Sequence, residues 1–143
     1  MIANVFKSLV FVLLCSLLIT GCVANAETEV TQRIRQALTQ GNHRLLASQF
    51  TNKVTIKVNN ETFQYSKTQA TFVMRSFFRA NPAIRFEYLH QGIMKSGRPY
   101  TLGIYRTPSQ TYSLALLLVP YNKDFLIEKM VFSEINGKGI SSK

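Results

Sequence analysis

The sequence is poor in the residues that most catalytic and metal centres need. Its 143 residues include two cysteines, two histidines, seven aspartates and glutamates together, and no tryptophan. Cys15 and Cys22 lie in the first 22 residues, while His43 and His90 are far apart along the chain. This spacing excludes a conventional zinc site, and there is no nucleophile elbow or phosphate-cradling glycine loop. We therefore expect no metal and no cofactor, and we favour a protein that is not an enzyme.

Acidic side chains are scarce beside the basic ones. The chain has 17 lysines and arginines against seven aspartates and glutamates, for a formal net charge of +10. The basic residues are scattered, with no cluster of five or more, so nucleic acid is not an expected partner. A basic excess of this kind instead favours anionic surfaces, such as lipid headgroups or acidic polymers of a cell envelope.

The N-terminal residues have the pattern of an export signal. Lys7 precedes an apolar run over residues 9–19, which is too short to span a membrane but has the length of a secretory signal core. After cleavage of the signal, about 120 residues would remain, which is enough for one domain with a hydrophobic core. We expect an exported protein.

Two cleavage sites compete at the end of that run. The residues Ile19-Thr20-Gly21-Cys22 resemble a bacterial lipobox, in which the cysteine is acylated and the leader is cut before it. We favour this site, with residues 1–21 as the signal peptide, Cys22 as the lipid attachment and residues 22–29 as a tether on the periplasmic side of a membrane. The alternative is an ordinary cut after Ala26, because Ala24-Asn25-Ala26 satisfies the small-x-small rule and would release a soluble periplasmic protein.

The mature chain is predicted to start with helices. Apolar residues at Val30, Ile34, Ala37 and Leu38 have the spacing of one helical face over residues 28–39, and a short helix is expected over residues 43–50. A longer helix should begin after Ser66, a good N-cap, and end before Pro82. Most phenylalanines, Phe72 among them, are expected in the core.

Strand patterns fill the rest. Residues 54–58 and 62–65 should form a hairpin around Asn59-Asn60, and residues 84–91, 100–107, 111–119 and 125–134 should form a four-strand meander. Residues 30–135 are therefore expected to make one α+β domain, with N-terminal helices and one long helix packed on a bent antiparallel sheet of four to six strands. Residues 136–143 are expected to be a disordered tail.

A resemblance supports this prediction. The segments IRQALTQGNHRLLASQF, FQYSKTQATFVMRSFFRANP and FEYLHQGIMKSGRPYTLGIYRT resemble domain of unknown function 4783, a family of small exported bacterial proteins. The order of helices and strands also resembles the cystatin-like cone of the nuclear transport factor two-like superfamily. The resemblance implies the cone fold and a cavity between the long helix and the sheet, but it implies no activity.

The candidate ligand-binding residues are those expected at that cavity. Strict alternation puts Phe86, Tyr88 and His90 on one face of their strand and Glu87 on the other. His90 could then act as an acid or base near neutral pH, and the phenols of Tyr88, Tyr65 and Tyr112 could donate to an oxyanion. No second carboxylate is placed to complete an acid–base pair.

Two hypotheses follow. The first is a non-enzymatic binding or assembly module of the envelope, whose partner is a membrane through its lipid anchor together with an envelope protein or a glycan; tyrosines beside Arg98 and Arg106 suit such a surface. A homodimer through the sheet is suggested by fold analogy. The second is a small-molecule carrier or enzyme that uses the cone cavity with His90 and Tyr88.

Overall fold

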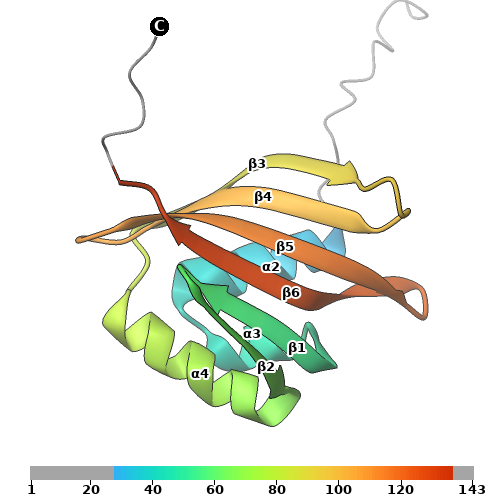
Figure 1. Cartoon of the computed structure of the whole chain (residues 1–143), viewed down its shortest axis with the longest axis horizontal. Coiled ribbons are helices and arrows are strands. Elements are labelled where there is room, and N and C mark those ends of the chain that lie inside the picture. The colour runs from blue at the N-terminus through green and yellow to red at the C-terminus, as the bar shows by residue number, and fades with distance from the viewer. Residues whose placement is uncertain (1–27, 137–143) are drawn as a thin grey trace, which may run out of the picture.

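Figure 1 shows the computed structural model of the chain, which describes residues 28–136. Three helices and six strands follow one another in the described range: α2 (Glu29–Gln40), α3 (His43–Ala47), β1 (Phe50–Val58), β2 (Glu61–Ser66), α4 (Lys67–Ala80), β3 (Arg85–Ile93), β4 (Pro99–Arg106), β5 (Thr111–Tyr121) and β6 (Asp124–Glu134). This is the expected α+β order. The leader, Cys22 and residues 137–143 of the predicted tail lie outside the described residues.

The helix ends follow from their capping residues. The Thr28 side chain accepts a hydrogen bond from the Thr31 backbone, and Gly41 ends α2 in the left-handed region at φ 62°. At α4 the Ser66 hydroxyl accepts from the Gln69 backbone N–H at 3.2 Å, while the Ser66 N–H donates to the Gln69 side chain at 3.0 Å. This reciprocal capping box confirms the predicted start of the long helix.

Two local predictions are wrong. The second helix ends at Ala47 instead of continuing to residue 50, because Phe50 already belongs to β1, where it pairs with Ile127 and is fully buried. Phe72 is not in the core: it lies on the outer side of α4 and is 61% exposed. The opposite side of the same helix buries Ala70, Met74 and Phe78 instead.

The six strands form one sheet in the order β2-β1-β6-β5-β4-β3. All neighbouring strands run antiparallel except β1 and β6, which pair in parallel with Ile56 opposite Met130. The expectation of a purely antiparallel sheet is therefore wrong at this one pairing. The β1–β2 hairpin is completed before α4 crosses the sheet, so β1 joins the edge of the later meander in the same direction as β6.

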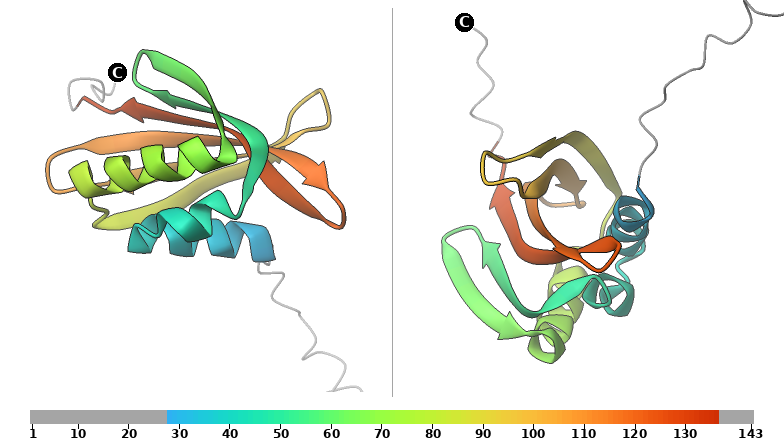
Figure 2. Two further views of the ribbon diagram at one scale, coloured as in Figure 1. Left: turned by 90° about the horizontal axis from the view of Figure 1, so that it is seen from below. Right: turned by 90° about the vertical axis from the view of Figure 1, so that its right-hand side faces the viewer.

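The helices all lie on one side of a strongly curled sheet, as both views in Figure 2 show. Between them and the sheet lies a continuous apolar core to which every helix contributes, with Ile34, Leu46, Met74, Leu114, Ile127 and Phe132 among its fully buried side chains. The other side of the sheet, here called the outer face, is covered by none of the described helices (Figure 2). Within residues 28–136 no helix is long and apolar enough to cross a membrane.

Candidate functional site

A β-bulge moves His90 away from the face that simple alternation predicts. On β3, Phe86 pairs with Tyr105 and Tyr88 with Gly103, but His90 pairs with Leu102, one residue out of step. Leu89 is the extra residue at this shift, and from there on the two faces of the strand are exchanged. His90 consequently lies on the outer face and is exposed, while Phe86 is buried in the core. The prediction that Tyr88 and His90 share a face is wrong.

The phenols on the core side hold structural hydrogen bonds. The Tyr88 hydroxyl donates to the backbone carbonyl of Thr31 at 2.8 Å and so ties β3 to α2. The Tyr105 hydroxyl donates to the Asn81 carbonyl at 2.6 Å, and the Tyr112 hydroxyl donates to the Asn81 side-chain oxygen at 3.1 Å. Both bonds fasten the C-terminal end of α4 to the sheet, so these phenols are engaged in holding the fold together.

Burial also changes the acidity of two of these phenols. Burial raises the pKa of Tyr105 far above its ordinary value, with a smaller contribution from neighbouring Tyr112. Burial likewise raises the pKa of Tyr112, assisted by the negative charge of Glu134. A raised pKa makes each group a poorer proton donor to a substrate at neutral pH. Tyr65, the fourth predicted residue, lies apart from them on β2, where its ring is 6.0 Å from that of exposed Phe63.

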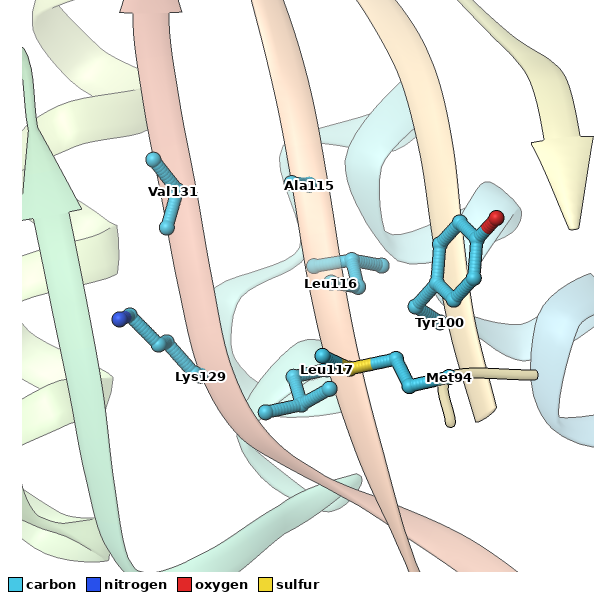
Figure 3. Close-up of a pocket in the computed structure, with 7 residues that line it drawn as sticks. All are labelled: Met94, Tyr100, Ala115, Leu116, Leu117, Lys129 and Val131. Atoms are coloured by element: carbon cyan, nitrogen blue, oxygen red, sulfur yellow. The ribbon is translucent and has the colours of Figure 1, made fainter. Parts of the chain in front are cut away.

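The outer face of the sheet has a groove of about 400 Å³. Its floor comes from β5 and β6, where Ala115, Leu117 and Val131 point away from the helices, and its sides come from Met94 and Tyr100. In Figure 3, Met94 extends from the β3–β4 connection toward Leu117, and Tyr100 and Lys129 lie on either side of β5. The groove thus has an apolar interior with one ammonium group at its edge.

Tyr100 is held in place at this groove from two sides. Gly92 lies directly opposite it on β3, and a Cβ there would come within 2.9 Å of the Tyr100 ring, so the ring packs over the glycine backbone. The Tyr100 hydroxyl also lies 3.1 Å from the His90 Nε2. His90 therefore positions a wall of the outer groove instead of serving the interior.

An ion pair draws the β3–β4 hairpin across the sheet. Arg98, in the hairpin turn, lies 2.5 Å from the Glu128 carboxylate on β6, so it reaches over β5. Glu128 is the extra residue at a second β-bulge, between the Leu117–Lys129 and Leu118–Ile127 pairs, which turns its side chain toward the hairpin. The contact brings Met94 and Tyr100 over the floor of the groove.

The surroundings of the groove are basic. Lys129 lines it, Lys57 pairs with Val131 on the same face, and Lys95 follows Met94 in the hairpin turn. None of these lysines forms an ion pair with any residue in the range 28–136. The groove therefore suits an apolar group that is flanked by negative charge. Across the same range, no three His, Cys, Asp or Glu side chains gather so as to hold a metal ion.

The sequence gives little indication of most groove residues; of those that line the groove, only Tyr100 is among the tyrosines near Arg98 and Arg106 that were expected at a binding surface. Leu117, Ala115 and Val131 have the alternation of ordinary half-buried strands. Gly92 could have indicated this site from the sequence, because a glycine inside a strand often accompanies a β-bulge or a close approach of another residue to the backbone.

Comparisons with known proteins agree with this architecture. A family model described as a domain of unknown function (DUF4783) matches residues 31–133. No curated protein matches the chain.

Several solved structures are similar to this chain in fold. A DUF4783 family protein from Bacteroides ovatus is 22% identical, with a TM-score of 0.67 over 72% of this chain and 93% of that one. Another, from Bacteroides fragilis, is 18% identical with a TM-score of 0.67 over 71% and 95%. A domain of unknown function with a cystatin-like fold from Nostoc punctiforme is 12% identical, with a TM-score of 0.61 over 82% and 80%. At these identities the likeness shows the cystatin-like fold alone.

Proposed function

The chain belongs to the DUF4783 family, and we propose that it is a non-enzymatic binding module of the cell envelope that holds a partner in the groove on its outer face. The observation that supports this most is the apolar groove itself, since it lies open on the face that no described helix covers. Concave, mostly apolar pockets of a few hundred Å³ commonly bind ligands or partner side chains.

The contrast with the interior supports a binding role over a catalytic one. Phe86, Leu116 and Tyr105 are each at most 5% exposed, and they fill the space that a cavity enzyme would need. Tyr88 and His90, the pair on which that alternative depended, lie on opposite faces of the sheet. The polar side chains that line the outer groove are Tyr100, whose hydroxyl contacts His90, and Lys129, and no carboxylate is among its lining residues.

The expected partner is a protein whose contact surface has an apolar side chain surrounded by acidic residues. Lys57, Lys95 and Lys129 surround the groove without ion-pair partners among the described residues, so a complementary surface must be negative. A second copy of this chain would bring the same lysines against one another, and the excess of basic over acidic residues adds to that repulsion. Charge therefore favours a different, acidic chain over a homodimer.

The location is part of the proposal. An export leader with Cys22 as the lipid attachment would hold the domain by a short tether at the membrane surface, within reach of envelope proteins. Mass spectrometry of the mature N-terminus tests this: an acylated Cys22 at the first position is expected, and a free Glu27 at the N-terminus would contradict it. Cys22→Ala should release the protein from the membrane fraction.

The partner is tested with matched variants of the full chain in its own cells. Leu117→Glu puts a charge on the groove floor, while Phe72→Glu puts the same charge on an exposed apolar residue of α4. After chemical cross-linking in cells, we expect one hetero-adduct with an acidic protein that is lost in Leu117→Glu and kept in Phe72→Glu. A homodimer adduct, or equal loss in both variants, would contradict the proposal.

A further inference from the structure

A second pocket lies at the opposite side of the molecule from the outer groove. It has a volume of about 390 Å³ and lies between the end of α2, the start of α3 and the C-terminal half of α4. Gln40 and Gly41 form one side, Phe78 and Pro82 form the apolar side, and His43, Arg75 and Arg79 carry its charge. No carboxylate lines it.

The cations around this pocket repel one another. Arg75 and Arg79 are one turn apart on the same face of α4, and Arg44 follows His43 on α3. In residues 28–136 none of the three arginines forms an ion pair. Burial lowers the pKa of His43, and the charges of Arg44, Arg75 and Arg79 lower it further. All three guanidinium groups therefore lie near the His43 imidazole.

A purely structural explanation accounts for part of this cluster. Arg79 lies in the last turn of α4, where a cation interacts favourably with the helix dipole. The helix dipole does not explain why Arg75 and His43 also line the pocket, with Arg44 next to His43 in the chain. Like charges held together around an open pocket are stabilised when an anion enters it.

We propose that this pocket binds a phosphate group. Two guanidinium groups at adjacent turns provide paired donors that match phosphate oxygens, and the imidazole adds a third donor when it is protonated. The pocket is larger than a phosphate ion, so the group would be part of a phosphorylated molecule whose apolar portion contacts Phe78 and Pro82. Both a free phosphorylated compound and a phospholipid headgroup carry this chemistry. The inference does not depend on the outer groove.

The test uses the full chain and inorganic phosphate at constant ionic strength. The protein has two histidines, so the His43 imidazole signals can be assigned by comparison with His43→Gln and followed by NMR. Saturable shifts of His43 are expected, with its pKa raised on binding because the dianion offsets the charges of Arg44, Arg75 and Arg79. His90 signals, on the outer face, should not respond.

Substitutions distinguish specific phosphate binding in this pocket from non-specific electrostatic attraction to a basic protein. Arg75→Gln and Arg79→Gln should each weaken phosphate binding about tenfold or more, as loss of a charge-assisted hydrogen bond predicts. Arg106→Gln removes the same charge from an exposed position on β4 and should leave binding unchanged. Absence of a saturable His43 shift, or equal weakening in Arg106→Gln, would overturn the proposal.

A second experiment distinguishes a phospholipid headgroup from a soluble phosphorylated compound. Vesicles of phosphatidylcholine with phosphatidic acid are compared with vesicles of phosphatidylcholine alone. Binding to the acidic vesicles that is lost in Arg75→Gln but kept in Arg106→Gln assigns the site to a lipid headgroup. Binding of inorganic phosphate with no difference between the vesicles assigns it to a soluble phosphorylated compound. If neither probe distinguishes Arg75→Gln from Arg106→Gln, the pocket is not a phosphate site.

Discussion

Tyr105→Phe tests whether the interior phenols are structural, and its effect should change sign with pH. Tyr105 is fully buried, and its hydroxyl donates to the Asn81 carbonyl at 2.6 Å. Removing the hydroxyl at pH 7 should lower the free energy of unfolding by about 1.4 kcal/mol, the combined effect of a lost hydrogen bond and a carbonyl left with one donor fewer.

Alkaline pH should cancel this loss. The ordinary phenol pKa is 10.0, and burial raises that of Tyr105 well above it in the folded chain. Above pH 10 the unfolded chain therefore releases a proton that the native state retains, so the stability present below pH 10 falls as the pH rises. The fall is about 1.4 kcal/mol by pH 11 for one such group. Phenylalanine has no proton to release, so Tyr105→Phe should equal the wild type near pH 11 and exceed it at higher pH.

Urea unfolding followed by far-ultraviolet circular dichroism at several values between pH 7 and pH 12 measures both effects. Tyr121→Phe is the control, since Tyr121 is 57% exposed and its replacement should change stability by no more than about 0.5 kcal/mol at any of these values. A constant difference between Tyr105→Phe and the wild type across this range would contradict the prediction, because it would mean that Tyr105 titrates alike in the folded and unfolded states.

Three further changes test the packing that positions the two sites. Thr101→Val should raise the free energy of unfolding by about 1 kcal/mol in urea unfolding, because the buried Thr101 hydroxyl has no hydrogen-bond partner among the described residues; a loss of stability would contradict this. Gly103→Ala should lower it by about 2–3 kcal/mol, since a Cβ there would meet the Glu87 carbonyl at 2.7 Å; an unchanged midpoint would be inconsistent with that close approach. Ser66→Ala should lower it by about 1 kcal/mol through loss of the capping box, and faster amide exchange in the first turn of α4 should accompany it.

Local signals explain why much of the fold could be predicted from the sequence. The Ser66 cap and the Asn81-Pro82 end placed α4 to within a residue, because both depend on contacts inside one or two turns. Asn59 was expected at a turn, and it adopts a positive φ there. Similarly, Val30, Ile34 and Leu38 are fully buried as their spacing predicted.

The errors in strand pairing and in strand faces come from contacts between one element and another. The parallel pairing of β1 with β6 joins strands on either side of α4, which no local pattern specifies. The bulge at Leu89 exchanges the faces of β3 and so moved His90 to the outer face. The groove depends on the Arg98–Glu128 contact across β5, and the phosphate pocket combines α2, α3 and α4. Both sites consist of residues from several elements, so neither can be identified from one segment of the sequence.

We propose that the protein binds its partner through the outer groove and not through the interior of the cone. The most direct test is a photo-cross-linking amino acid placed at position 117 of the full chain in its own cells, with position 72 as the control site. We expect a discrete adduct with an acidic protein at position 117 that is absent at position 72. Equal labelling at both positions, or no adduct at position 117, would contradict it.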